Sequence, residues 1–279
     1  MREAGVYPDV SWEEYTSWPA ERSSVLTKVA KSPRHAYAAM MDPGEPTPAM
    51  ELGTALHMAI LEPKRFEAEY AVPPKVDRRT REGKATWNAF IEEHADKTHL
   101  SHDKYQACLA ARHAVWREPW AEALLAGQGY NELSALWVDP ESKLTCKLRA
   151  DRLAGDFEGS PVILDIKSCT DASKDAFARS IARYDYHVQS ALYRDGFKAL
   201  RDHYRRPMWL AVETYSPYCA ALYEPSDEML EEGQRRYRAA LLTIRECRDS
   251  GVWPGYDSGV RMLDLPAWAK PDRFEEDEF

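Results

Sequence analysis

The feature that most constrains the fold is a run of three strand-like segments between residues 131 and 168. The segments are NELSALWVD, KLTCKLRADRL and PVILDIKS, and their connections contain PES and AGDFEGS. Short connections rich in Pro, Gly, Asp and Ser are typical of turns, so two of them between apolar segments predict consecutive hairpins. We therefore expect three neighbouring strands of one sheet, with their pairing fixed by where the chain turns.

Helical patterns occupy most of the chain on both sides of these segments. Ser11 and Glu14 form a predicted capping box, and the last long pattern begins at Ser226 and ends at Gly251. Further helices are predicted over SSVLTKVAKSPRHAYAAMM with an interruption at Pro33, over Met50 to Leu61, from about Tyr105 to Leu125 with an interruption near Pro119, and over DASKDAFARSIARYDYHVQSALYRDGFKAL with Asp171 or Ser173 as its cap. PMWLAVET and CAALYEP predict one more strand pair.

This mixture of helices and strands predicts a single α/β domain over residues 1–279, because no repeat or low-complexity linker divides the sequence. We expect a mainly helical part over residues 1–128 and a central mixed sheet over residues 129–225. A C-terminal helix with an acidic tail is expected over residues 226–279. With 44% hydrophobic residues, a chain of 279 residues can bury a sizeable core.

Composition excludes several classes of protein. No apolar stretch approaches the roughly 20 residues of a membrane helix, and MREAGVYPDV lacks the apolar segment of a secretory signal, so we expect a cytoplasmic protein. The five cysteines lie far apart without a C-x-x-C pair, which argues against a zinc ribbon, an iron-sulfur cluster or a disulfide framework. A net charge of -9 argues against coating nucleic acid by bulk attraction, although local basic patches can still bind it.

The two hairpins bring acidic residues together. If AGDFEGS turns about Glu158, Asp151 lies opposite Asp165; if the earlier loop turns between Glu141 and Ser142, then Glu132 lies opposite Asp151. Strand alternation supports this pairing. In the middle strand it predicts one face from Leu144, Cys146, Leu148 and Ala150, and a polar face from Thr145, Lys147, Arg149 and Asp151.

Directly opposed carboxylates repel one another unless something positive lies between them. A divalent cation meets that need, and oxygen ligands suit Mg²⁺ or Mn²⁺. Lys167, two residues after Asp165, shares its face and can align an attacking water or offset developing negative charge. The alternative is a surface charge lattice in which Arg149, Lys147 and Lys167 merely neutralise the acids. The acid-x-Lys spacing alone does not decide, since it also occurs at Glu62, Glu82 and Glu141.

His57 is a further candidate ligand, on the helix in GTALHMAI. Gly53 lies one turn earlier on the same face and would allow another segment to approach closely. A lone histidine on such a helix is more often a packed core residue, so both interpretations stay open.

Together these motifs carry a family resemblance. GTALH, Glu132, RAD, LDIK and HVQSALY, in that order, resemble the motifs of the PD-(D/E)XK nuclease superfamily. The match is similar to the RecB-like branch and, within it, to RecE-type phage exonucleases (exodeoxyribonuclease VIII). It runs from about Ser11 to Tyr256, and the ordered set is far more specific than any single motif. The implied fold is a restriction-endonuclease-like core with a central mixed sheet flanked by helices and an N-terminal helical extension.

The resemblance implies roles for individual residues. It assigns His57, Asp151, Asp165 and the backbone carbonyl of Ile166 to the metal, and Lys167 to catalysis. Three further residues take supporting roles: Glu132 as an additional or outer ligand, and Gln189 and Tyr193 as the Q-x-x-x-Y motif that lines the active site. The cofactor is Mg²⁺, for which Mn²⁺ can substitute. The four-cysteine cluster of some relatives is absent, so no iron-sulfur cluster is expected.

The basic stretch VDRRTREGKATWNAF is either a solvated loop or a DNA contact. The resemblance favours the second interpretation, with phosphates or a terminal 5′-phosphate held near a duplex end. The predicted contacts precede or open a helix expected to begin near Thr86, and they are Arg78, Arg79, Arg81, Lys84 and Trp87.

By resemblance, the function is Mg²⁺-dependent 5′-to-3′ digestion of double-stranded DNA ends in phage or prophage recombination. A homo-oligomeric ring around DNA and a RecT-like single-strand annealing partner are expected in the cytoplasm of a bacterial host, with no membrane. Two alternatives stay open. One is an endonuclease or single-strand nuclease of the same fold, and the other is a non-catalytic module that binds DNA or a protein.

Overall fold

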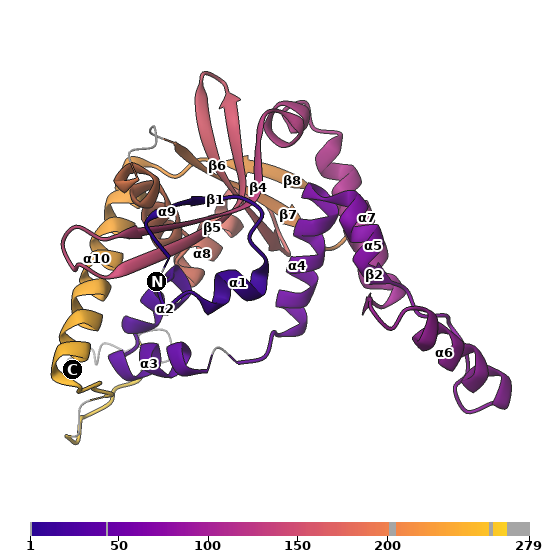
Figure 1. Ribbon diagram of the computed structural model, residues 1–279, viewed down its shortest axis with the longest axis horizontal. Coiled ribbons are helices and arrows are strands. Elements are labelled where there is room, and N and C mark those ends of the chain that lie inside the picture. Colours follow the sequence, from indigo (N-terminus) through magenta and orange to yellow (C-terminus); the bar gives the residue numbers. More distant parts are fainter. Residues whose placement is uncertain (1, 43, 201–204, 257–258, 267–279) are drawn as a thin grey trace, which may run out of the picture.

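The computed structural model describes residues 2–42, 44–200, 205–256 and 259–266, and in this part of the chain a six-stranded mixed sheet forms the centre of the fold. Its strands, in spatial order, are β1 (Gly5–Tyr7), β4 (Gly129–Val138), β5 (Thr145–Phe157), β6 (Ser160–Cys169), β7 (Arg206–Glu213) and β8 (Ala220–Tyr223). β6 and β7 run parallel, and the other neighbours run antiparallel. The predicted α/β class with a central mixed sheet is confirmed (Figure 1).

Helices cover both faces of this sheet. They are α1 (Trp12–Ser17), α2 (Ser23–Val29), α3 (Pro33–Met41), α4 (Pro48–Leu61), α5 (Pro63–Glu69), α6 (Arg81–Glu93), α7 (His102–Trp116), the π-helix η1 (Glu122–Ala126), α8 (Lys174–Tyr184), α9 (Tyr186–Ala199) and α10 (Asp227–Ser250). One core joins α2, α3, α9 and α10 to β4 and β5. The other joins α4, α5 and α7 to β6, β7 and β8. α8 packs on Trp209 and Ala211 of β7, on the face that α9 also covers.

The predicted hairpin register is confirmed by the pairs on either side of the acids. Leu133 pairs with Ala150 and Asn131 with Arg152, so Glu132 lies across from Asp151. Arg152 in turn pairs with Leu164, so the next residues of the two strands, Asp151 and Asp165, lie across from one another. The second pairing also depends on an irregularity between Ala154 and Phe157, which shifts the register by one residue from that of the turn, where Phe157 pairs with Ser160.

The predicted alternation of faces holds along only part of β5. Leu148, Ala150 and Leu153 all contribute to the same core, so the alternation is interrupted after Ala150. The irregularity lies beside Glu132 of β4, whose φ of 52° places it in the left-handed region. The predicted apolar face of Leu144, Cys146, Leu148 and Ala150 is confirmed, and the break comes between Ala150 and Leu153.

Several predicted helix boundaries also need correction. The basic segment's helix begins at Arg81 rather than near Thr86, because the Thr80 hydroxyl accepts the Gly83 N–H and caps it. The interruption expected near Pro119 is confirmed, because α7 ends at Trp116 and η1 follows over Glu122–Ala126; α7 begins at His102 rather than near Tyr105. The long pattern after Ser173 forms two helices, α8 and α9, separated by Asp185 with φ 58°. The caps at Ser11, Ser226 and Gly251 are confirmed. The acidic tail lies outside the described residues.

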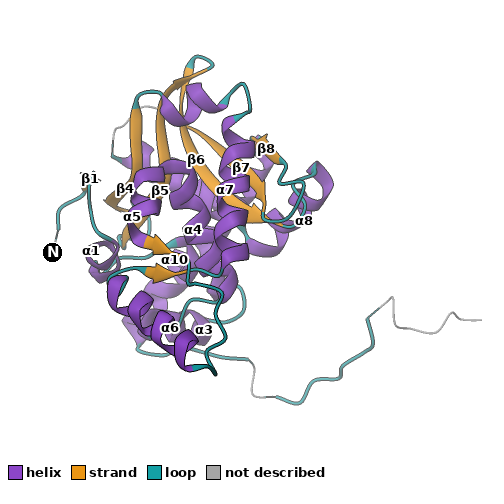
Figure 2. Ribbon diagram, turned by 90° about the vertical axis from the view of Figure 1, so that its right-hand side faces the viewer, coloured by secondary structure: helices purple, strands orange, loops and turns teal. Residues whose placement is uncertain are grey.

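The segment around α6 extends away from the six-stranded sheet as an arm (Figure 1 and Figure 2). Two short parallel strands, β2 (Tyr70–Ala71) and β3 (Thr98–His99), join its two ends. α6 itself is amphipathic in pattern but buries only Gly83. In the described ranges, no helix is both long and apolar enough to cross a lipid bilayer.

Candidate active site

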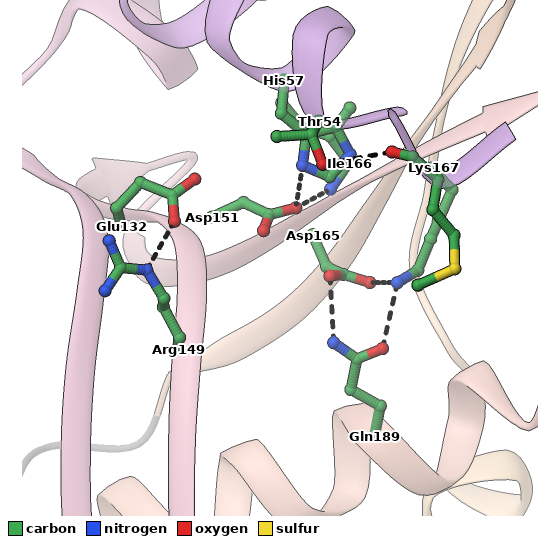
Figure 3. A network of polar contacts seen from close by, with 10 residues as sticks. Thr54, His57, Glu132, Arg149, Asp151, Asp165, Ile166, Lys167 and Gln189 are labelled. Carbon is green, nitrogen blue, oxygen red and sulfur yellow. Dashed lines mark hydrogen bonds and ion pairs between the residues drawn. The ribbon is translucent and has the colours of Figure 1, made fainter. Parts of the chain in front are cut away.

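The predicted site residues meet where β5 and β6 separate. Arg152 pairs with Leu164, after which β5 continues beside β4 and β6 continues beside β7 as far as Cys169. The Ile166 N–H donates to Asp151 Oδ2 at 2.7 Å, so a carboxylate occupies the place where a strand partner would otherwise accept. The fork between two strands thus positions Asp151 beside the backbone of β6 (Figure 3).

His57 enters the fork from α4. Its Nδ1 lies 3.4 Å from Asp151 Oδ2, and its side chain is 24% exposed. α4 lies close to β6 at Gly53, where an added Cβ would lie at an ordinary contact distance of 3.4 Å from Ser168 Oγ. Because the imidazole turns toward the acids, His57 is not simply a packed core residue.

Asp165, Lys167 and Gln189 form a closed set of contacts next to it (Figure 3). Lys167 Nζ lies 2.6 Å from Asp165 Oδ2 and donates to Gln189 Oε1 at 3.0 Å. Gln189 Nε2 donates to Asp165 Oδ1 at 3.2 Å. Tyr193, one turn after Gln189 on α9, is buried and interacts with the Gln189 side chain. α9 thereby fixes both ends of the Asp165–Lys167 pair.

Glu132 lies at the edge of this centre and is paired with Arg149 (Figure 3). Arg149 Nε donates to Glu132 Oε2 at 2.7 Å, and the same guanidinium donates to the Val10 carbonyl and to Ser134 Oγ. The charge-lattice interpretation therefore fits the Arg149–Glu132 pair. It is wrong for Lys147, whose buried ammonium donates to three backbone carbonyls, those of Tyr15, Thr16 and Trp18.

Burial and mutual charge shift the site's titratable groups in different directions. Burial raises the pKa of Asp165 to about 6, even though Lys167 acts against it. Burial also acts to raise the pKa of Asp151, but the charges of His57 and Lys167 outweigh it and lower that pKa. The pKa of Lys167 is lowered by burial but raised overall by Asp165 and Asp151, so its ammonium stays protonated at neutral pH. The pKa of His57 is raised overall in the same way.

The donor set fits a hard divalent cation. Within the described ranges, no three His, Cys, Asp or Glu side chains already form a ligand cluster, since His57 is turned to Asp151 and Lys167 to Asp165. Asp165 is buried, and its Oδ2 lies 2.6 Å from Lys167 Nζ. A buried carboxylate beside a second carboxylate and an imidazole suits Mg²⁺ or Mn²⁺. The predicted ligand role of the Ile166 carbonyl stays a prediction.

The predicted DNA-binding residues do not lie at the fork but on the arm. Arg78, Arg79, Arg81 and Lys84 are exposed, and Trp87 is half-buried. The Arg78 guanidinium lies 4.2 Å from the centre of the Trp87 ring, and Arg79 pairs with Asp77. The structure thus groups these residues with one another around the start of α6.

The sequence analysis missed Tyr186. Lys167 Nζ lies 4.4 Å from the centre of its ring, a cation–π contact inside the site. A helical signal was available, because Tyr186 precedes Gln189 by three residues and therefore shares its face of α9.

Comparison with known proteins agrees with this geometry. A solved structure of a candidate exonuclease from Eubacterium rectale has a TM-score of 0.59 and 11% sequence identity, over 92% of this chain and 96% of that chain. At this identity the likeness shows the fold alone. A second structure, SSO0001, has 15% identity over 69% of this chain and 86% of its own, but its TM-score of 0.30 supports no argument. No protein with a curated description matches the chain.

A family model described as "PDDEXK-like domain of unknown function (DUF3799)" matches residues 22–264. This confirms the resemblance to the PD-(D/E)XK superfamily. The match covers most of the chain and spans β4 to β8, the fork and α10. The chain therefore belongs to this PDDEXK-like family.

Proposed function

We propose that the chain is a magnesium-dependent deoxyribonuclease that hydrolyses phosphodiester bonds with an activated water and forms no covalent enzyme intermediate. One observation carries the proposal. The fork between β5 and β6 brings Asp151 and Asp165 together beside His57, with Lys167 Nζ 2.6 Å from Asp165 Oδ2. Membership of a PDDEXK-like family supports the same chemistry.

Asp151, Asp165 and His57 would hold the metal, and Glu132 would join them as an outer ligand. When bound, the cation lowers the pKa of a water molecule and withdraws charge from the phosphate oxygens. Asp151 is prepared for this role, because its lowered pKa keeps it ionised at neutral pH. Gln189 keeps Asp165 oriented by donating to Oδ1, so that Oδ2 stays directed into the site.

Lys167 acts as a charged donor in this proposal. Because its pKa is raised, it is poorly suited to accept a proton from water at neutral pH. An ammonium can instead orient the attacking water and stabilise negative charge that develops on the phosphorus oxygens. Tyr186 and Gln189 restrict where that ammonium can lie.

The substrate is proposed to be a double-stranded DNA end, digested 5′-to-3′. Arg78, Arg79, Arg81 and Lys84 on the arm would contact phosphates, with Trp87 close to the duplex end. A homo-oligomeric ring with a positive channel would reconcile such binding with a net charge of -9. We further propose a role in phage or prophage recombination, beside a RecT-like annealing protein in the bacterial cytoplasm.

The proposal is tested with linear and circular duplex DNA of the same sequence, with or without a 5′-phosphate. With Mg²⁺ we expect loss of 5′-terminal nucleotides from the linear substrate and an intact circle. Ca²⁺ should permit binding without digestion, because its longer and looser coordination positions water poorly. A cleaved circle would indicate an endonuclease, and digestion of single strands alone would indicate a single-strand nuclease. If neither Mg²⁺ nor Mn²⁺ supported cleavage, the nuclease proposal would be wrong and the non-catalytic binding module would be the remaining hypothesis.

Metal affinity is expected to rise with pH. Asp165 must be ionised to bind a cation, and burial raises its pKa to about 6, so binding weakens about tenfold for each pH unit below 6. His57, whose pKa is also raised, must lose its proton before the imidazole can bind, so affinity should rise further above neutral pH. Calorimetric titration with Ca²⁺ between pH 5 and pH 8 measures both steps. An affinity that does not change with pH would contradict these assignments.

A further inference from the structure

Two tyrosines flank the junction between α8 and α9, immediately beside the proposed catalytic centre. The rings of Tyr184 and Tyr186 are stacked, with centroids 5.6 Å apart and an interplanar angle of 25°. Tyr186 is partly buried, whereas Tyr184 is 54% exposed. An exposed aromatic ring stacked on a second ring beside a cationic site is more than core packing requires.

The pair continues a row of cations and rings that begins inside the site. Lys167 Nζ lies 4.4 Å from the centre of Tyr186, and the Arg183 guanidinium lies 5.4 Å from the centre of Tyr184. The row therefore leads from the ammonium that contacts Asp165 to the exposed end of α8. Arg179, one turn before Arg183, is also exposed.

The backbone between α8 and α9 adopts an uncommon conformation that side-chain contacts hold in place. Asp185, between the two tyrosines, has φ 58°, in a region that residues other than glycine seldom adopt. Arg236 of α10 donates to Asp185 Oδ1 at 2.5 Å and lies 3.3 Å from His187 Nε2. This clamp fixes the ends of both helices, so the two rings are presented rigidly rather than on a flexible loop.

We propose that Tyr184 and Tyr186 form a platform on which an unpaired nucleobase stacks, next to the phosphodiester that is cut. The inference rests on the proposed nuclease function and defines a subsite for its substrate. Aromatic rings stack on any base, because every base has a π face. A base inside a duplex has both faces covered by its neighbours, so the platform takes a terminal or unpaired base. Arg183 then lies where it can contact the following phosphate.

The platform also favours one substrate geometry over another. If the base beside the cut stacks on Tyr184, then its strand has separated from the complementary strand at that point. A frayed or single-stranded end should therefore engage the site more readily than a blunt, GC-rich end. The base identity should matter little, because stacking uses the π face that every base has.

The test uses short single-stranded DNA with 2-aminopurine at each terminal position in turn, because stacking quenches its fluorescence. With Ca²⁺ present, the parent protein should quench the probe at one position near the end. Tyr184→Ala should remove that quenching and raise Kd about tenfold, within the range of about 5- to 150-fold for loss of one stacked base. Tyr184→Phe keeps the ring and should stay within about twofold of the parent.

Tyr37→Ala is the matched control. Tyr37 lies on α3, away from the fork; it is 41% exposed and packs on Trp253. It should leave both quenching and Kd unchanged. In digestion assays with Mg²⁺, Tyr184→Ala should raise KM and leave kcat within a few-fold of the parent.

The outcomes separate the platform from the nuclease function. If the parent digests DNA and Tyr184→Ala matches Tyr37→Ala in Kd, KM and quenching, the platform is wrong and the nuclease function stands. If Tyr184→Ala weakens binding and quenching but the parent cleaves nothing, the platform stands and the hydrolytic proposal is wrong. A parent protein that binds no DNA would overturn both.

Discussion

Replacing Lys167 by methionine is expected to lower the rate of DNA hydrolysis by about a thousandfold and to leave cation binding intact. Methionine fills a similar volume but cannot donate to water or to a phosphate oxygen. Removing a single preorganised donor to developing negative charge typically costs about 100- to 1000-fold in rate. Lys167 also pairs with Asp165, so the loss should lie at the upper end of that range.

The more specific part of this prediction is that Lys167→Met still binds the cation. Lys167 Nζ lies 2.6 Å from Asp165 Oδ2 and would compete with a cation for that oxygen. Without the ammonium, Ca²⁺ should bind Lys167→Met at least as tightly as the parent, as measured by calorimetry. Lys28→Met, at an exposed position of α2, is the control and should change neither rate nor affinity. Digestion by Lys167→Met at the parental rate would remove Lys167 from the mechanism.

The position of these residues could be predicted because hairpin pairing is a local property of the chain. The turn near Ser142 sets Glu132 across from Asp151. The turn near Glu158, together with the register shift between Ala154 and Phe157, sets Asp151 across from Asp165. Gln189 and Tyr193 follow from helical spacing alone, without knowledge of the sheet. Helix starts at Ser11 and Ser226 were likewise readable from their capping chemistry.

The fork itself could not be predicted, because it depends on long-range contacts. The sequence does not reveal that the Ile166 N–H bonds a side chain instead of a neighbouring strand. The position of Lys147 is decided by carbonyls more than 120 residues earlier in the chain, at the end of α1. Glu132 required tertiary knowledge too, since its backbone leaves the β region and its carboxylate is taken by Arg149. Local rules fail here because competing partners lie elsewhere in the sequence.

Asp165→Asn is expected to abolish activity, with a loss of more than about a thousandfold, and to make the metal-free protein more stable. The substitution keeps the shape of the side chain but removes the charge that a cation needs. The pKa of Asp165 in the folded protein, about 6, lies above its ordinary value of 3.8, because burial disfavours the ionised carboxylate. Its contribution to the free energy of unfolding is therefore full below pH 3.8 and is lost as the pH rises through about 6.

At neutral pH a neutral amide should recover about 1–3 kcal/mol of that free energy, because each pKa unit corresponds to about 1.4 kcal/mol. Lys167 keeps an acceptor in Gln189 Oε1, so its own burial stays compensated. Chemical denaturation at pH 7.5 with and without Ca²⁺ measures both effects: the parent should gain stability from the ion, and Asp165→Asn should not. Glu246→Gln, which neutralises an exposed carboxylate on α10, should behave like the parent. If Asp165→Asn is less stable than the parent and is still stabilised by Ca²⁺, then Asp165 is structural. If the variant is more stable and no longer responds to Ca²⁺, then the Asp165 carboxylate lowers the stability of the protein and serves to bind a cation.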